Sequence, residues 1–362
     1  MNVLDILACP ACGSGEFRKD QDKLTCNGCG GRYSILRDII DFRDAKLDVS
    51  AGFSITDDQT LADKMSEVFD RTSTFNEMYD VYFSHFNRQK CGDNIRAINM
   101  IEFIESSKIA PRPLTPAQLV HGPAILEKIP GYLDGAAQLP DGIALEDGAG
   151  LGLYVDGFSS RFKQLVVVDL SIAQLLLARK IMDERGIQNV TLICANVERL
   201  PFRSNAFDFV HSNNVIEHVS DQKALLQEAW RTLKPNGMLF LLSPNRFSLY
   251  FEPHFRLPGY GFFPTAIRRK IIQVRQKRSI DDISLLSLGE LRKLMAGQFG
   301  EGVHVSFIPR HLSNAVTGGG IRNLLVKLLN SKVFGAATDL LINKIVLGIM
   351  PYHAVVCFKR SK

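Results

Sequence analysis

The chain has 362 residues, a formal net charge of +5 at pH 7, and 46% hydrophobic and 22% charged residues. This balance is ordinary for a soluble globular protein, and the length exceeds one nucleotide-binding domain of about 200 residues, so further modules are expected. No uncharged apolar run approaches the ~18 to 20 residues of a membrane-spanning helix. The first residues lack the basic-then-apolar pattern of a secretory signal, and we therefore expect a cytoplasmic protein.

Four of the seven cysteines form two Cys-x-x-Cys pairs near the amino terminus, Cys9 with Cys12 and Cys26 with Cys29. Two such pairs close together supply four thiolates for a tetrahedral zinc ion. Two disulfides are the alternative, and they are rare in a chain without an export signal. The spacing therefore predicts a small zinc ribbon over residues 1–44.

The segment from Leu4 to Phe42 is similar to small bacterial zinc-ribbon proteins whose eukaryotic relatives activate methyltransferases as separate subunits. The resemblance implies that such a ribbon is fused here to an enzyme. Ribosomal RNA guanine methyltransferases also carry an amino-terminal zinc ribbon, which leaves an RNA substrate open as an alternative. A ribbon of ~40 residues buries too little surface to fold alone, so we expect the metal to act first in folding.

Residues 45–140 separate the ribbon from a nucleotide-binding pattern. Their first part, from Gln59 to Ile109, is predicted to be helical, and prolines punctuate the rest. We expect this region to form a helical cap or linker.

The most informative stretch is Leu-Glu-Asp-Gly-Ala-Gly-Leu-Gly at residues 145–152. It follows a short apolar strand, and a second strand from Gln164 to Leu170 carries Asp169 near its end. A strand, a glycine turn, a helix and a strand ending in an acid form a nucleotide-binding βαβ unit. Glycine has no Cβ and tolerates positive φ, so the backbone can approach a ligand closely. The dinucleotide fingerprint needs a third glycine at the position of Leu153, and this chain does not have it.

Further segments follow in a regular order. They are a β-branched run (189–195), a strand with a polar tip (206–214), a helix (221–234) and a fifth strand (238–243). Lys234-Pro235-Asn236-Gly237 is predicted to end the helix, and Asn236 tolerates the left-handed φ that a turn requires.

From Leu145 to Asn245, these motifs resemble class I S-adenosylmethionine-dependent methyltransferases of the type 11 family, which includes ubiquinone and menaquinone biosynthesis enzymes. The resemblance implies an α/β fold with a Rossmann-like, seven-stranded, doubly wound sheet over residues 141–362. The sixth and seventh strands are predicted at His304–Ile308 and His353–Lys359.

The resemblance also implies S-adenosylmethionine as cofactor and a role for each matching residue. Glu146 holds the loop or the cofactor's amino group, and Asp169 accepts hydrogen bonds from the ribose hydroxyls. Asn213 faces the sulfonium and the substrate, with a plain helix cap as the alternative. Asn196 stands where the family usually has aspartate. The remaining cofactor contacts are Gly148, Gly150 and Gly152 under the methionine and ribose, and Asn196 and Val197 beside the adenine.

Glu217 and His218 follow the fourth strand and are the candidate catalytic residues. A histidine near the methyl donor can take a proton from an attacking hydroxyl, since its unperturbed pKa is ~6.5. Structural hydrogen bonding at the start of a helix is the alternative role. The sulfonium is a strong electrophile, so positioning and one base suffice.

After the fifth strand, Arg246 to Ser279 holds eight basic, one acidic and seven aromatic residues. We expect it to form part of a substrate-binding insertion over residues 246–300, at the carboxyl ends of the strands where such sheets bind ligands. The candidate substrate residues are Glu252, His254 and Arg256.

Two segments combine apolar and basic residues. In 265–278, Ile267, Ile271 and Val274 share one helical face among basic side chains, a pattern typical of interfacial or phosphate-binding helices. A solvated basic helix is the alternative. A second helical insertion over 311–350 carries amphipathic runs. We regard 265–278 and 321–350 as candidates for peripheral contact with the inner membrane face.

Together these features predict a methyltransferase acting on a small or lipid- or sugar-linked acceptor. Oxygen is favoured because no Asn/Asp-Pro-Pro-Tyr motif for amines or bases follows the fourth strand. One alternative is an RNA (rRNA or tRNA) base methyltransferase, although the positive charge is local and the balance mild. A second is a zinc-ribbon binding protein without activity, against which the intact glycines and Asp169 count. The oligomeric state does not follow from the sequence.

Overall fold

A computed structural model describes residues 3–43, 53–85, 140–249, 254–255, 257–276, 280–281, 283–299, 304–308 and 352–359. Their contacts divide the chain into two compact units. The first comprises residues 1–212, 219–239 and 359–362, and the second comprises residues 213–218 and 240–358. Each unit is described by itself.

The first unit begins with a small antiparallel sheet. A 3-10 turn, η1 (Val3–Asp5), precedes β1 (Phe17–Lys19), β2 (Lys23–Cys26), β3 (Arg32–Leu36) and β4 (Ile39–Asp41), and each strand pairs with the next. Gly13 and Gly30, with φ of +76° and +73°, follow the cysteine pairs as left-handed turn residues. This hairpin arrangement is the one that the cysteine spacing favours.

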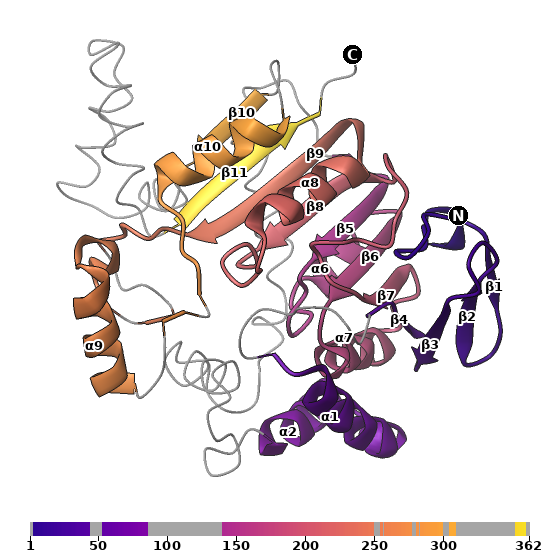
Figure 1. The fold of residues 1–362 in the computed structure, drawn as a ribbon. Helices are drawn as coiled ribbons and strands as arrows, with labels where there is room; N and C mark the ends of the chain where they lie inside the picture. The colour runs from indigo at the N-terminus through magenta and orange to yellow at the C-terminus, as the bar shows by residue number, and fades with distance from the viewer. Residues whose placement is uncertain are drawn as a thin grey trace. The chain divides into compact units, whose positions relative to one another are not determined.

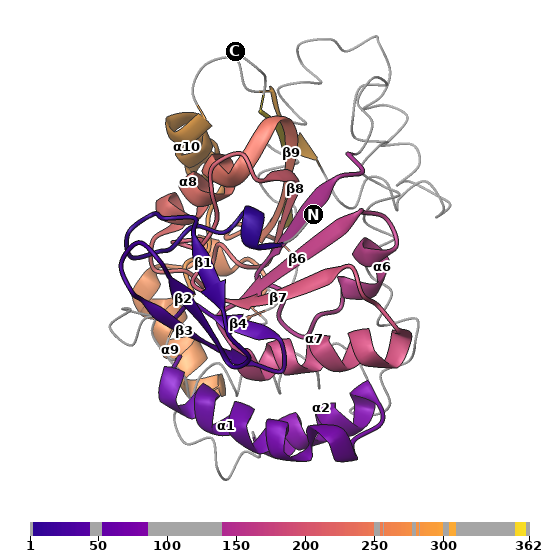
Figure 2. The same cartoon turned by 90° about the vertical axis from the view of Figure 1, so that its right-hand side faces the viewer.

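The ribbon continues into the main sheet through its last strand. β4 pairs in parallel with β7 (Val190–Cys194), with Ile40 opposite Ile193 and Asp41 opposite Cys194 (Figure 2). The Phe42 amide extends the ladder by donating to the Cys194 carbonyl at 2.8 Å. The sequence does not predict this pairing, because a three-residue strand is too short for its residue pattern to indicate which strand it pairs with.

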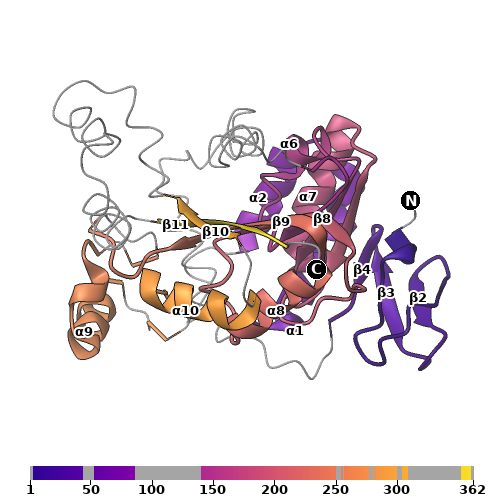
Figure 3. The same cartoon turned by 90° about the horizontal axis from the view of Figure 1, so that it is seen from above.

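The parallel sheet of the first unit has the order β4-β7-β6-β5-β8, followed by β9. Its strands are β5 (Ile143–Asp147), β6 (Gln164–Asp169), β7, β8 (Phe207–Asn213) and β9 (Leu233–Pro244), which runs on into the second unit. The helices α6 (Val155–Ser159) and α7 (Ile172–Arg185) cover one face, and α8 (Gln222–Thr232) lies on the other (Figure 3). The doubly wound α/β arrangement is thus confirmed for these residues.

The helix boundaries follow ordinary capping chemistry. The Ser171 side chain accepts from the Gln174 amide at the start of α7, and Gly186 ends it with a φ of 65°. One predicted boundary is wrong, because α8 ends at Thr232 and β9 already begins at Leu233. The expected turn survives inside the strand, where Asn236 has a φ of 63°.

Two helices pack against α7 in the first unit. They are α1 (Ile55–Val68), followed by the 3-10 turn η2 (Phe69–Arg71), and α2 (Phe75–His85) (Figure 2). The buried Lys180 of α7 donates to the carbonyls of Phe69 and Thr72 at 2.9 and 2.8 Å, and its ammonium lies 3.8 Å from the Phe69 ring centre. The helical prediction for this region is confirmed up to residue 85, and residues 86–139 lie outside the described residues.

The second unit contains the end of β9, β11 (Tyr352–Phe358) and β10 (His304–Ile308), in that order. β10 and β11 are antiparallel, and α10 (Leu288–Phe299) lies along one face of them (Figure 1). A 3-10 turn, η4 (Tyr260–Phe262), precedes α9 (Thr265–Gln276). Both strands lie at the predicted positions to within one residue.

α9 leaves most of the predicted apolar face exposed. The residue it buries is Ile272, which joins a cluster with Phe255 and Tyr260, and Ile271 packs partly against that cluster. Ile267 and Val274 stay 48% and 72% exposed. The predicted helical insertion over 311–350 lies outside the described residues. Among the helices that are described, none combines the length and apolarity of a membrane span.

Arg43 is a buried cation between the ribbon, α1 and β6. Its guanidinium donates to Asp41 at 2.9 Å and to Asp58 at 2.7 Å, and also to Gln59 and the Leu170 carbonyl. The Asp58 carboxylate in turn accepts from the Ser171 hydroxyl and from the Ile172 amide at 2.9 Å. Only 2% of the Arg43 side chain is exposed, so these charges are compensated by one another rather than by water.

Arg43→Gln is expected to lower the free energy of unfolding by about 3 kcal/mol, because it leaves the buried Asp58 carboxylate and the partly buried Asp41 carboxylate without their cation. The matched control is Arg269→Gln, which breaks an ion pair with Asp281 whose side chains are 57% and 62% exposed. That control should cost no more than about 1 kcal/mol. Urea unfolding of both variants measures the difference, and equal losses would contradict the role given to Arg43.

Candidate functional site

The glycine turn after β5 has the backbone that its sequence predicts. Gly148, Gly150 and Gly152 have φ of 80°, 53° and 76°, all in the left-handed region. The amides of Gly148 and Ala149 donate to the Val168 carbonyl at 2.9 and 3.0 Å. The turn is therefore fastened to the end of β6.

The glycines serve different purposes within this turn. Among the described residues, a Cβ placed on Gly150 would meet no heavy atom within 4 Å, so these residues leave the backbone open on that side. A Cβ on Gly152 would lie 2.8 Å from the Ala178 Cβ and 2.9 Å from its Cα. Gly150 thus leaves room for a ligand, whereas Gly152 lets α7 pack against the turn.

Asp169 ends β6 beside the turn. Its Oδ2 accepts from the Gly150 amide at 2.8 Å, and its Oδ1 accepts from the Ser171 amide at 2.9 Å. These bonds fix the orientation of the carboxylate. A carboxylate is the kind of group that can accept hydrogen bonds from ribose hydroxyls.

Asn196 and Val197 follow β7, the strand next to β6, and both are buried. The Asn196 Oδ1 accepts from the Glu198 amide at 2.9 Å, and the Ala195 amide donates to the Asp169 carbonyl at 3.0 Å. The structure therefore brings the glycine turn, Asp169 and Asn196 together at the carboxyl edge of the sheet in the first unit. The Asn196 amide NH₂ is the group that can donate to an adenine nitrogen.

Glu146 points into the interior of the first unit. Its Oε2 lies 2.7 Å from Nδ1 of His211 on β8, and the rings of Tyr154 and Phe158 pack against that imidazole. Burial raises the pKa of Glu146, and the neighbouring His211 partly opposes that shift. The pair links β5 to β8, which suits the loop-holding role.

Asp147 is a buried acid that sequence reasoning missed. Neither of its carboxylate oxygens has a hydrogen-bond partner among the described residues. Burial, together with the carboxylates of Glu146, Asp169 and Glu228, raises its pKa well above the usual range. The signal that could have found it is the pair of consecutive acids at the end of an apolar strand. Successive side chains of a strand point to opposite faces of the sheet, so Asp147 faces the side opposite to Glu146.

In the second unit, Glu217, His218 and His254 come together. The Nε2 atoms of the two histidines are 3.2 Å apart, and the Glu217 Oε1 lies 3.8 Å from that of His254 and 4.0 Å from that of His218. The two predicted catalytic residues thus meet one predicted substrate residue. Asn213, the last residue of β8, also belongs to this unit. Glu252 and Arg256 lie outside the described residues.

The four ribbon cysteines lie with all Sγ atoms within 4.8 Å of one another. Cys9 and Cys29 are 3.7 Å apart and Cys12 and Cys26 are 3.6 Å apart, which excludes disulfide bonds of ~2.05 Å. A tetrahedron with Zn–S bonds of ~2.3 Å has edges of about 3.8 Å. The Tyr33 hydroxyl lies 3.0 Å from the Cys9 sulfur, as an outer-shell donor would. The donor set therefore fits zinc.

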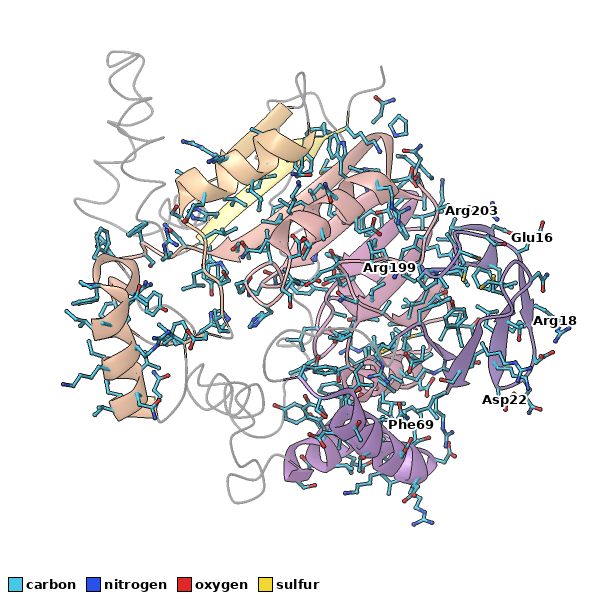
Figure 4. The ribbon with its side chains drawn as sticks, viewed as in Figure 1. Glu16, Arg18, Asp22, Phe69, Arg199 and Arg203 are labelled. Atoms are coloured by element: carbon cyan, nitrogen blue, oxygen red, sulfur yellow. The ribbon has the colours of Figure 1, made fainter. Side chains whose placement is uncertain are left out.

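Basic side chains of the 199–203 segment fasten the ribbon to the core. Arg203 donates from its guanidinium to the carbonyls of Leu7 and Gly15 at 3.2 and 3.0 Å, and from its amide to that of Ile6 at 2.8 Å. Arg199 donates to the carbonyl of Pro10. Figure 4 shows both arginines on the side of the core where the ribbon residue Glu16 lies. These contacts and the β4–β7 pairing hold the ribbon at two places.

Comparison with protein families identifies the central part of the chain. Residues 145–241 match the family described as "Methyltransferase domain". The central part of the chain is thus similar to methyltransferase domains. The matched segment begins in β5 and ends in β9, and it includes the glycine turn, Asp169 and Asn196.

Similar curated proteins include several named as quinone-biosynthesis methyltransferases. The 2-methoxy-6-polyprenyl-1,4-benzoquinol methylase of Leishmania donovani is 31% identical over 121 residues, 33% of this chain and 42% of that protein. The ubiquinone biosynthesis O-methyltransferase of Paracidovorax citrulli is 31% identical over 117 residues, 32% of this chain and 49% of that protein. An uncharacterized protein of Methanocaldococcus jannaschii is 37% identical over 131 residues, 36% of this chain and 53% of that protein. The chain spans about half the length of these relatives.

The solved structures that the chain matches include phosphoethanolamine N-methyltransferase 2 of Haemonchus contortus in complex with S-adenosyl-L-methionine. It is 15% identical, with 80% of this chain and 61% of that chain covered and a TM-score of 0.45.

Two substitutions test whether Gly152 is needed for packing against α7 and Gly150 is not. Gly152→Ala is expected to lower the free energy of unfolding by at least about 2 kcal/mol, since left-handed strain adds to a clash with α7. Gly150→Ala should cost only the strain, about 1 kcal/mol, because its Cβ meets open space. Urea unfolding without added ligand measures both, and equal losses would contradict the packing role of Gly152.

Proposed function

We propose that the chain is an S-adenosylmethionine-dependent methyltransferase that binds the cofactor at the carboxyl edge of the first unit. The observation that carries the proposal is the Gly150–Asp169 contact. A left-handed glycine that borders open space donates at 2.8 Å to an acid at the end of the neighbouring strand. The methionine part of the cofactor needs a backbone that it can approach closely, and the ribose needs an oriented carboxylate that accepts from its hydroxyls.

When bound, S-adenosylmethionine supplies an electrophilic methyl group on its sulfonium, so the protein has mainly to position the two reactants. In this proposal, the turn from Gly148 to Gly152 lies under the methionine and ribose part. Asp169 accepts from the ribose hydroxyls, and Asn196 and Val197 flank the adenine. Glu146 acts indirectly, by fixing β5 against His211 of β8.

The proposed acceptor is a small or lipid- or sugar-linked molecule, methylated at oxygen. The names of two relatives, a polyprenyl-benzoquinol methylase and a ubiquinone O-methyltransferase, support an acceptor with an apolar tail. Glu217, His218 and Asn213, which belong to the second unit, are proposed to act on the acceptor, with His218 as the group that takes the proton of its hydroxyl.

The ribbon is proposed to bind one structural zinc ion through Cys9, Cys12, Cys26 and Cys29. The support is that all four sulfur atoms lie within 4.8 Å of one another, with two pairs at 3.7 and 3.6 Å, and that the Tyr33 hydroxyl lies beside Cys9. Because β4 belongs to both the ribbon and the main sheet, loss of this metal would also loosen one edge of the cofactor-binding unit.

We further propose that the protein contacts membrane surfaces peripherally through α9. The support is a row of exposed apolar side chains beside basic ones. The apolar members are Phe262, Ile267 and Val274, 56%, 48% and 72% exposed, and the basic members are Arg268, Arg269, Lys270 and Arg275. Such a surface can insert shallowly while its cations pair with anionic headgroups.

Cofactor binding tests the proposed function directly. S-adenosylmethionine and S-adenosylhomocysteine at a few hundred micromolar should each raise the melting temperature by several degrees through linkage, whereas NAD should not. Asp169→Ala should raise the Kd for S-adenosylmethionine at least about tenfold, the equivalent of ~1.4 kcal/mol. Asp141→Ala, which removes an acid 70% exposed at the amino end of β5, is the control. An unchanged Kd for Asp169→Ala would refute the ribose assignment, and no shift with any ligand would refute the cofactor.

Vesicle binding tests the surface of α9. The double variant Ile267→Glu/Val274→Glu should lose at least about five-fold in affinity for vesicles that contain anionic lipid, because it removes the inserting apolar groups. The control is Thr265→Glu/Gln273→Glu, which adds the same charge at exposed polar positions of the helix. Its affinity for the same vesicles should fall less. Equal losses of affinity in the two double variants would mean that the added charge, and not the removed apolar groups, weakens binding. If the wild-type protein does not bind these vesicles, the membrane proposal is overturned.

A further inference from the structure

Three metal-binding side chains meet in the second unit, apart from the ribbon cysteines. They are Glu217 and His218, which follow β8 after a short turn, and His254, which lies 36 residues further along the chain. Each offers one donor atom, and these atoms lie within 4.8 Å of one another. The set consists of two imidazole nitrogens and one carboxylate oxygen.

The distances between the three donor atoms fit a metal centre. The triangle formed by the two Nε2 atoms and the Glu217 Oε1 has sides of 3.2, 3.8 and 4.0 Å. The point equidistant from its corners lies about 2.1 Å from each atom, and Zn–N and Zn–O bonds are ~2.0 to 2.2 Å. An ion at that point would be within bonding distance of all three groups.

The backbone holds these side chains in place. The Glu217 carbonyl accepts from the Ser284 amide at 2.8 Å, and the His218 amide donates to the Val215 carbonyl at 2.8 Å, which closes a tight turn. The imidazole of His254 packs beside Phe255, which is buried in the core of this unit. A metal site needs such prior orientation, because each ligand that must be ordered on binding weakens the complex.

The three donors differ in how far their side chains are buried. A catalytic metal site needs an accessible side, where a further ligand can bind. The Glu217 side chain is fully buried, whereas those of His254 and His218 are 13% and 32% exposed. A carboxylate removed from water is stabilised by a cation against it. The exposed side of His218 leaves a path for an ion and for a further ligand. Structural zinc sites, in contrast, are closed by four protein ligands.

We propose that Glu217, His218 and His254 bind one divalent transition-metal ion of the zinc class, in addition to the zinc of the ribbon. Two imidazoles favour Zn²⁺, Co²⁺ or Ni²⁺ over Mg²⁺ and Ca²⁺, which prefer oxygen ligands. Three protein ligands leave at least one position for water or for an oxygen of another molecule.

The site has a second consequence, which rests on the proposed function. An acceptor oxygen at the open position would be held by the ion, and its hydroxyl would become more acidic. In that case the Nε2 atom of His218 binds metal and is not itself the base. The metal-binding proposal stands or falls without the methyltransferase proposal, because it concerns only these three side chains.

The test is metal stoichiometry of the full chain. Protein whose ribbon is filled with zinc is desalted and titrated with Co²⁺, and binding is followed by calorimetry and by the visible absorption of cobalt. We expect one further ion per chain, with the weak visible bands of nitrogen and oxygen ligands and without the strong sulfur-to-cobalt bands of the ribbon. His218→Ala and His254→Ala should each weaken this second ion at least tenfold and leave the ribbon metal in place.

The control variant is Asp281→Asn, which removes an exposed carboxylate of the same unit and should still bind two ions. S-adenosylmethionine binding and circular dichroism of each histidine variant show whether it is folded. A chain that binds only the ribbon metal up to millimolar Co²⁺ would overturn the proposal, and so would folded histidine variants that keep the second ion. A second ion without cofactor binding would leave the metal site standing and refute the proposed function instead.

Discussion

The direction of the strands decides where the polar groups of the first unit meet. β4, β7, β6, β5 and β8 run parallel, so their carboxyl ends share one edge of the sheet. Each strand contributes a polar residue there, in the order Asp41, Cys194, Asp169, Asp147 and Ser212. The turn from Gly148 to Gly152 can open this edge only because its glycines adopt positive φ.

The ribbon contributes a strand and side chains to this edge of the sheet. β4 adds a parallel strand beside β7, and Arg43 carries the connection on to Asp58 and, through it, to Ser171. Ser171 also donates from its amide to Asp169. A continuous set of hydrogen bonds therefore joins the end of the ribbon to the acid proposed to hold the ribose. Folding of the ribbon and order at this edge are physically linked, since neither Arg43 nor Asp58 tolerates burial without the other.

The second unit holds a different kind of chemistry. Its notable groups are two imidazoles and a buried carboxylate, whereas the first unit presents backbone amides and fixed acids. Glu217 and His218 come from a turn after β8, and His254 comes from a segment beyond β9.

The sequence by itself determined the elements whose chemistry is local. The glycine turn, the acid after it, the cysteine pairs and most strands follow from spacing, φ tolerance and apolar runs, which neighbouring residues decide. Only the tertiary structure placed β4 beside β7, buried Arg43, turned Glu146 toward His211 and left Asp147 without a partner among the described residues. The same holds for His254 beside His218 and for Ile272, rather than Ile267 or Val274, as the buried residue of α9. These outcomes depend on contacts between segments far apart in the chain, and no local pattern encodes which distant surface a side chain will meet.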